Sequence, residues 1–177
     1  MYYIAVVLPP HLDEQVKQLK QHMFDKYNCL VGLKSPAHIT IIAPFWTEAE
    51  KEDGLIRAID HLSSILKPFK LATADFSCFK PRTIFIAVKS NDSLNQLKRE
   101  ADDFFSKRDY PIKKESRPFH PHITIATRDL FKKDFAEAWP YFEKKEFKEE
   151  WTVEGLSLLR HNKKNWDVIH TSQFKTL

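Results

Sequence analysis

Hydrophobic and polar residues alternate in several short runs of this chain, and between those runs they recur at helical spacing. Residues 2–8 form an apolar run that ends at two prolines, which predicts a strand. In residues 11–27 apolar side chains recur every three or four positions, which predicts an amphipathic helix. The same criteria predict strands at 38–43, 69–79, 83–89, 122–127, 151–160 and 165–174, and helices at 92–108 and 129–146. One more helix is expected to open at a capping box, Thr47 with Glu50, and to continue through Leu66.

Three short segments recur in the same order about 80 positions later. They are Tyr3–Val6 with Phe85–Val88, His38–Ile41 with His122–Ile125, and Phe76–Phe79 with Leu156–Leu159, at offsets of 82, 84 and 80. Shared strand propensity is the simpler explanation, but three matches in one order favour a duplicated unit. The sequence therefore predicts a single α+β domain over residues 1–177. Its repeat halves lie at about 1–79 and 83–160, a strand at 165–174 closes it, and the halves face each other across a pseudo-twofold axis and a cleft.

The most similar of these segments carries polar residues on a strand. Successive side chains of a strand point to opposite faces, so His38 and Thr40 share one face while the isoleucines between and after them share the other. The same holds for His122 and Thr124. If a twofold relates the halves, both polar pairs converge on the cleft.

Two histidines and two hydroxyls around one cavity suit a phosphodiester. With an ordinary pKa near 6.5, one imidazole can accept a proton from an attacking hydroxyl or water while the other donates one to the leaving oxygen. Threonine hydroxyls can donate hydrogen bonds to the phosphate oxygens and hold the phosphorus in line. No metal is required for this chemistry. A single histidine on a strand is more often structural, but the repeat of the whole His-x-Thr unit in register favours catalysis.

The composition of the chain argues against several other classes of protein. The chain is 42% hydrophobic and 29% charged, with a net charge of +4 that permits an anionic ligand without requiring one. Its three glycines are scattered, so it has no Gly-rich phosphate loop. Its two cysteines suggest neither a disulfide framework nor a zinc cluster. No apolar run approaches the ~18 residues that a membrane span needs, and the first residues lack a signal peptide's basic flank. We therefore expect a cytoplasmic protein.

The paired motifs His38-Ile39-Thr40-Ile41 and His122-Ile123-Thr124-Ile125 resemble the twin HxTx signature of the two-histidine (2H) phosphoesterases. That superfamily includes the bacterial 2′-5′ RNA ligase-like cyclic phosphodiesterases. The resemblance extends over nearly the whole chain, in length, repeated strand order, a Phe after the first motif and a Pro directly before the second.

The resemblance implies a bilobal α+β fold in which antiparallel sheets line a central cleft and helices pack outside. It implies a metal-independent enzyme, without cofactor, that acts on 2′,3′-cyclic phosphates or related 2′-5′ phosphodiesters of RNA ends or nucleotides. His38 and His122 would be the acid/base pair, with His38 the acid and His122 the base by analogy, and Thr40 and Thr124 would bind the phosphate. Arg128 would join them, since related proteins often carry an Arg just past the second motif. Residues 42–46 read Ile-Ala-Pro-Phe-Trp where relatives often have Phe-Leu-Gly, so the substrate itself stays open.

Aromatic and basic residues near the motifs are further candidates for the site. Phe45, Trp46 and Phe119 flank the motifs and could stack on a nucleobase, although Phe45 and Phe119 are equally suited to the core. The cations Lys34, Lys80, Arg82 and Arg117 stand beside predicted strand ends and are individually more typical of solvated loops. The turn at 160–164 is expected to be a passive hairpin tip.

Other interpretations predict different behaviour. His120 and His122 form an HxH pair that could bind a metal with His38, but no carboxylate flanks either motif closely. A non-catalytic module that binds RNA ends or nucleotides, and a purely structural repeat protein, are the rival classes. No partner protein or membrane contact is implied, and a monomer is expected.

Overall fold

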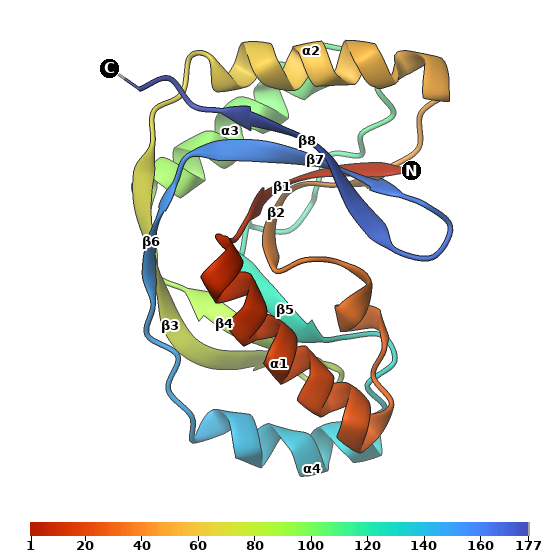
Figure 1. Cartoon of the computed structure of the whole chain (residues 1–177), viewed down its shortest axis with the longest axis vertical. Helices are drawn as coiled ribbons and strands as arrows, with labels where there is room; N and C mark the ends of the chain where they lie inside the picture. Colours follow the sequence, from red (N-terminus) through yellow and green to blue (C-terminus); the bar gives the residue numbers. More distant parts are fainter. Residues whose placement is uncertain (177) are drawn as a thin grey trace.

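The computed structural model describes residues 1–176, which form eight strands, four α-helices and two short 3₁₀ helices (Figure 1). In chain order these are β1 (Tyr2–Val7), α1 (Pro10–Tyr27), η1 (Val31–Lys34), β2 (His38–Phe45), η2 (Ala49–Lys51), α2 (Glu52–Ser63), β3 (Phe69–Phe79), β4 (Thr83–Val88), α3 (Asp92–Ser106), β5 (His122–Ala126), α4 (Lys132–Glu143), β6 (Glu150–Val153), β7 (Gly155–His161) and β8 (Trp166–Gln173). The predicted α+β class is confirmed.

The strands form two four-stranded antiparallel sheets, with the orders β2-β1-β7-β8 and β5-β4-β3-β6. The two orders correspond strand for strand if β1, β2 and β7 are matched with β4, β5 and β3. In this correspondence the third strand of each repeat pairs with a strand of the other repeat: β3 pairs with β4, and β7 pairs with β1. Each sheet is therefore built from both halves of the sequence.

Helices α1 and α3 also pack on the sheet that carries the other repeat's motif strand. In Figure 1, α2 and α3 lie at the top of the molecule and α1 and α4 at the bottom. Helix α1 contacts β5 and α4 contacts β3 and β4, whereas α3 contacts β2 and α2 contacts β7 and β8. Helix α1 thus leaves β1 and packs on the opposite sheet before the chain returns as β2.

The alternation of side chains along β2 and β5 divides them between core and cleft. Ile39 and Ile41 of β2, and Ile123 and Ile125 of β5, are at most 1% exposed and belong to the main hydrophobic core. His38 and Thr40 on β2 alternate with these isoleucines and are only partly buried, as are His122 and Thr124 on β5. The alternation ends at Ile42 and Ala126, which again belong to the core. A smaller cluster centred on Tyr3 lies on the cleft face of β1. Burial of the isoleucines thereby fixes which face carries the histidines.

Two predicted elements differ from the structure. The prediction of a capping box at Thr47 and Glu50 is wrong. A 3₁₀ turn occupies 49–51, α2 begins at Glu52, and no side chain caps its first turn. The single strand expected at 151–160 is two strands, since β6 ends at Val153 and pairs with β3 while β7 starts at Gly155 and pairs with β1. The chain changes sheets between them.

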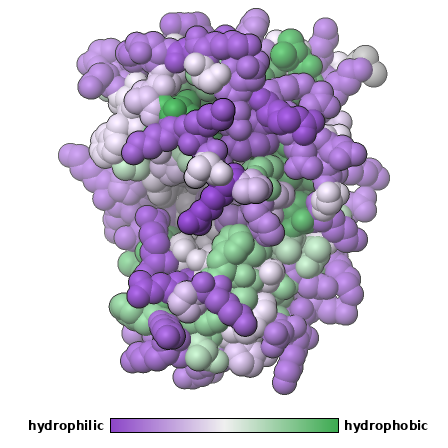
Figure 2. All heavy atoms as spheres, turned by 180° about the vertical axis from the view of Figure 1, so that it is seen from behind, coloured by the Kyte–Doolittle hydropathy of each residue, from purple (hydrophilic) through white to green (hydrophobic). Residues whose placement is uncertain are grey.

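The outer surface is mostly hydrophilic on the face shown in Figure 2, where hydrophobic residues gather below the centre. Among residues 1–176, no helix combines the length and the apolar character needed to cross a bilayer. Cys29 is buried and Cys78 partly buried, and both are free thiols.

Candidate active site

The two His-x-Thr motifs lie next to each other in the structure. His38 and Thr40 are on β2, His122 and Thr124 are on β5, and these strands are in contact although they belong to different sheets. All four side chains are half-buried. The folded chain therefore brings the repeated motifs together across the junction of the two sheets.

A cleft with two arms runs past these residues. One arm, which we name the His38 arm, has a volume of about 820 Å³ and is lined by His38, Thr124 and Arg128 among others. The other, the His122 arm, has a volume of about 760 Å³ and is lined by His122 and by residues 114–121. Thr40 lines both arms and so marks the point where they meet.

Both imidazoles are oriented by the same local hydrogen bond. Nδ1 of His38 lies 2.8 Å from the carbonyl oxygen of Pro36, and Nδ1 of His122 lies 2.7 Å from that of His120. Since a carbonyl can only accept, Nδ1 must carry the proton in each ring. The neutral tautomer then leaves Nε2 with a free lone pair for chemistry.

Aromatic rings pack against His38 from β1. The ring of Tyr3 lies 4.9 Å from the imidazole between centroids, and its hydroxyl is 3.4 Å from Nδ1. Burial lowers the pKa of His38 to about 4, and the positive charges of Lys20 and His122 act in the same direction. His38 is consequently neutral at pH 7 in the free protein.

The surroundings of His122 are similar in kind but more open. Phe85, which corresponds to Tyr3 in the repeat, lies 5.0 Å from its ring, and Phe79 lies 5.4 Å away. Burial lowers the pKa of His122, and the nearby His120 adds to that effect. His120 itself is exposed on the rim of the His122 arm.

Helix α1 holds the segment that leads into the first motif. Lys20 is 3% exposed, and its Nζ donates a hydrogen bond to the carbonyl of Ser35 at 3.0 Å. Asp13 accepts one from the amide of Ala37 at 2.6 Å. Burial lowers the pKa of Lys20 to about 8, while the charge of Asp13 opposes that effect. These contacts fix the peptide units on both sides of Pro36, whose carbonyl orients His38.

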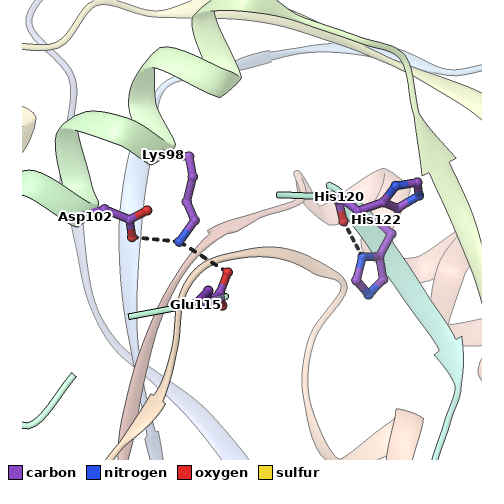
Figure 3. Close-up of polar contacts among 5 residues, drawn as sticks. All are labelled: Lys98, Asp102, Glu115, His120 and His122. Atoms are coloured by element: carbon purple, nitrogen blue, oxygen red, sulfur yellow. Dashed lines mark hydrogen bonds and ion pairs between the residues drawn. The ribbon is translucent and has the colours of Figure 1, made fainter. Parts of the chain in front are cut away.

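The segment that leads into the second motif is attached differently (Figure 3). Lys98 of α3 is buried to a similar extent, and its Nζ lies 2.7 Å from a carboxylate oxygen of Asp102 and 3.5 Å from one of Glu115. Residues 113–118 are exposed, and Glu115 is the carboxylate in that stretch that pairs with α3. This partly exposed ion pair ties residues 113–118 to α3, and Phe119, which follows them, packs against the core.

The predicted cations divide between the cleft and its surroundings. Arg128 and Lys34 line the His38 arm, and Arg117 lines the His122 arm. Lys80 and Arg82 line neither arm. The backbone of Arg128 has a φ of 55°, in the left-handed region, at the point where β5 has ended.

Asp129 ties this turn to the first half of the chain. One of its carboxylate oxygens accepts a hydrogen bond from the amide of Val31 at 2.8 Å, and the other is buried without a protein partner. Asp129 also lines the His38 arm. It thereby connects the turn that carries Arg128 to η1.

The three aromatic residues expected to stack on a base lie in different environments. Phe45 is 4% exposed and packs against Tyr2 and Tyr110 in the core, so its ring is not open to a ligand. Trp46 is 68% exposed but lines neither arm. Phe119 is half-buried and lines the His122 arm.

Sequence reasoning missed aromatic residues that do line the cleft. Tyr3, His161 and Trp166 all border the His38 arm. Alternation along the first strand could have placed Tyr3 on the face opposite the core. No local signal placed Trp166, because only the pairing of β7 with β1 brings the last hairpin to the site.

The HxH pair stands without a set of metal ligands around it. Within the described part of the chain, no group of three or more His, Cys, Asp or Glu side chains is arranged to hold a metal ion.

Sequence comparison places the whole chain in one group of proteins. The family described as the 2′-5′ RNA ligase superfamily matches residues 8–165. A protein of Geobacillus kaustophilus named "Putative phosphoesterase" is 26% identical over 176 residues, which cover 97% of this chain and 95% of that protein. A protein of the same name from Bacillus cytotoxicus is 25% identical over 171 residues, which cover 94% and 92%.

Solved structures share the fold. LigT of E. coli, in a crystal structure with 3′-AMP, matches with a TM-score of 0.65 and 17% identity over 99% of this chain and 98% of LigT. TT0787 of Thermus thermophilus matches with a TM-score of 0.64 and 19% identity over 98% and 97%. At these identities the likeness concerns the architecture of two sheets around a cleft.

Proposed function

Because this chain belongs to the 2′-5′ RNA ligase superfamily of 2H phosphoesterases, we propose that it hydrolyses a 2′,3′-cyclic phosphate or a related 2′-5′ phosphodiester. The substrate would be an RNA end or a nucleotide, and two-histidine acid/base catalysis would act on it. One observation carries the proposal: two His-x-Thr units, distant in sequence, border one cleft with Nδ1 of each imidazole occupied by a backbone carbonyl.

In the proposed reaction one Nε2 accepts a proton from water as the water oxygen attacks phosphorus. The bond from phosphorus to the departing ribose oxygen breaks, and the second imidazole donates its Nε2 proton to that oxygen. The carbonyls of Pro36 and His120 stabilise the positive charge that each ring carries when it is protonated. The product is a phosphomonoester, and the reaction leaves the base protonated and the acid neutral. One proton must then pass from the first ring to the second, through solvent, before the next turnover.

Phosphate binding is assigned to the hydroxyls and to one cation. Thr40 lies where the two arms meet, so its hydroxyl can donate to a non-bridging oxygen of a phosphate held between the rings. Thr124 and Arg128 border the same space from β5 and the turn after it. A guanidinium there would offset the negative charge that accumulates during attack.

The assignment of His38 as acid and His122 as base stays a prediction from the family resemblance. Burial opposes it in the free protein, since an acid must be protonated and His38 has its pKa lowered to about 4. The negative charge of a bound phosphate would raise the pKa of both rings. Which histidine acts as the acid depends on which ring has the higher pKa in the complex with substrate. An experiment that varies the leaving group can identify the acid.

A nucleotide-sized ligand fits the dimensions of the cleft. The solved structures of LigT with 3′-AMP, with NADP+ and with ATP describe nucleotides bound to that protein. The two arms of this cleft, at about 820 and 760 Å³, are each large enough for a nucleoside. This supports nucleotides or RNA ends as the substrate class.

The proposal is tested by assaying the purified chain on 2′,3′-cyclic nucleotides and on RNA with cyclic phosphate ends. His38→Ala and His122→Ala should each lower kcat by about 10²–10⁴-fold. His11→Ala is the matched control, because this histidine is exposed on α1 and lines neither arm, so its loss should change kcat by less than about threefold. Near-normal turnover in either motif variant would disprove the two-histidine mechanism.

Three further measurements separate the alternatives. Activity lost in EDTA and restored by a divalent metal would replace this proposal with a metal-dependent one. Nucleotide binding without turnover by the unaltered chain would indicate a binding module. The pH profile of kcat/KM should be bell-shaped and centred below 6.5, since the pKa of both histidines is lowered in the free protein.

Acid and base are distinguished by a diester whose leaving group needs no proton. The variant that lacks the general acid should recover most of its lost rate on a p-nitrophenyl phosphodiester, while the variant that lacks the base should not. Recovery by His38→Ala supports His38 as the acid. Recovery by His122→Ala reverses the two roles.

A further inference from the structure

A row of aromatic rings leads from His38 out along the His38 arm. The ring of Tyr3 lies 4.9 Å from His38, that of Trp166 lies 4.6 Å from Tyr3, and that of His161 lies 4.9 Å from Trp166, all between centroids. All four rings line the arm, together with Thr40 and Thr124. The row therefore begins at the proposed phosphate position and ends at the hairpin between β7 and β8.

The hairpin holds Trp166 in a defined place. His161 and Trp166 are register partners at the end of the β7–β8 ladder. The tip beyond them is closed by hydrogen bonds from the amides of Lys164 and Asn165 to the side chain of Asn162, at 3.0 and 2.7 Å. Figure 1 shows this hairpin extending past the rest of its sheet, on the side where the chain begins. A half-buried indole on such a support loses little freedom when a ligand stacks on it.

Polar groups line the same arm. Lys34 and Ser35 line it from η1 and the segment after it. An ammonium and a hydroxyl in the same arm can hydrogen-bond to the edge of a flat, polar ring system that stacks on the indole. Nucleobases have that combination of an apolar face and a polar edge.

We propose that Trp166, set on Tyr3, stacks on the nucleobase of the substrate and makes the His38 arm the base-binding subsite. The proposal rests on the proposed function, because it takes the phosphate to lie between His38 and His122. It replaces Trp46 and Phe45 as stacking residues, since one lies outside the cleft and the other lies in the core. A purine, with the larger ring system, should be preferred over a pyrimidine.

The test compares two cyclic phosphodiesters, of which one has a base and one has none. The unaltered chain and Trp166→Ala are assayed on adenosine 2′,3′-cyclic phosphate and on glycerol 1,2-cyclic phosphate. The ratio of kcat/KM for the two substrates should fall about tenfold in the variant. Trp46→Ala is the matched control and should keep the ratio of the unaltered chain. Trp166→Phe should recover part of the ratio, because it restores an aromatic face.

A parallel loss on both substrates would show that Trp166 only supports the fold, and an unchanged ratio would show that the base lies elsewhere. Either result overturns the proposal. Calorimetric titration with adenosine 3′-monophosphate and with inorganic phosphate gives a second readout that does not need turnover. Trp166→Ala should weaken binding of the nucleotide about tenfold more than binding of phosphate. If the unaltered chain hydrolyses neither substrate, the proposed function fails, and this titration alone decides the base subsite.

Discussion

The two motifs share a tetrapeptide and a hydrogen bond, but the segments that lead into them are built differently. Ahead of His38, the peptide units at Ser35 and Ala37 are held by the buried Lys20 and by Asp13. Ahead of His122, residues 113–118 are exposed. The same hydrogen bond, to the carbonyl two residues before each histidine, thus sets the tautomer of both imidazoles, while the side chains that hold the two lead-in segments differ. A duplicated site can acquire two different histidines in this way without any change in the motif.

The largest expected effect comes from breaking the contact between η1, which lies ahead of the first motif, and β5, which carries the second. A Cβ added at Gly32 of η1 would collide with the carbonyl oxygen of Ile125 in β5, which is backbone and cannot turn aside. Gly32→Ala should lower the free energy of unfolding by about 3 kcal/mol or more, measured by chemical denaturation.

Gly54→Ala is the matched control for this change. A Cβ there meets only the hydroxyl of Tyr110 at 3.4 Å, and the position lies within α2, so stability should stay equal or rise by up to about 1 kcal/mol. Equal stability losses in the two variants would show that η1 and β5 are not in tight contact.

A second expected effect separates the two histidines by their pH dependence. The folded pKa of His38 is about 4 and the unfolded value is near 6.5, so the unfolded chain binds the extra proton first. Stability is therefore full above pH 6.5 and falls as the pH drops toward 4, by on the order of 2 kcal/mol. His38→Gln should flatten this part of the pH–stability curve more than His122→Gln does. If His122→Gln flattened the curve more than His38→Gln, the inference that burial lowers the pKa of His38 further than that of His122 would be wrong.

A smaller effect is expected from Lys20. Its positive charge lowers the pKa of His38, so Lys20→Met should raise that pKa and move the acid limb of the kcat/KM profile to higher pH. NMR titration of the His38 ring measures the pKa directly. Lys17→Met, on the exposed face of the same helix, is the control and should leave it unchanged. A drop in the His38 pKa, or equal changes in both variants, would rule out this influence of Lys20.

The smallest effect is expected at the second lead-in segment. Glu115→Gln removes one ion pair of 3.5 Å, but Lys98 keeps its closer contact with Asp102. The free energy of unfolding should fall by less than about 0.5 kcal/mol, as for other exposed pairs. Glu146→Gln, which removes an exposed pair of Lys148, is the matched comparison. A loss well above that of the control would mean that residues 113–118 are held as firmly as Ser35 and Ala37.

Much of the architecture was predictable because it depends on local patterns. The period-2 burial of Ile39 and Ile41 fixed the face of β2, and the same pattern in β5 placed His122 opposite its isoleucines. The break at 153–155 was not predictable from apolar content, since both sides of it consist of strand residues. It arises because β6 pairs with β3 and β7 pairs with β1, and only the fold brings these partner strands to the two sides of the break.

The candidate site was predictable only in its repeated part. His38, Thr40, His122 and Thr124 could be found because duplication distinguishes them from ordinary strand residues. Trp166 and Lys20 could not, since Trp166 reaches the cleft only through the pairing of β7 with β1, and Lys20 contacts the segment ahead of His38 only once α1 is folded. Phe45 shows that closeness to a motif in sequence does not place a residue at the site, because its ring is buried in the core.

The exchange of β3 and β7 between the sheets bears on the ancestry of the site. A single half-length chain would lack the neighbour that its third strand needs, since β3 pairs with β4 and β7 with β1. Two copies of such a chain could complete each other's sheets by exchanging their third strands. The resulting homodimer would have a true twofold axis, two identical His-x-Thr units and equivalent histidines. Fusion of two such genes would then have released each copy to diverge, so that one lead-in segment could become buried while the other remained exposed.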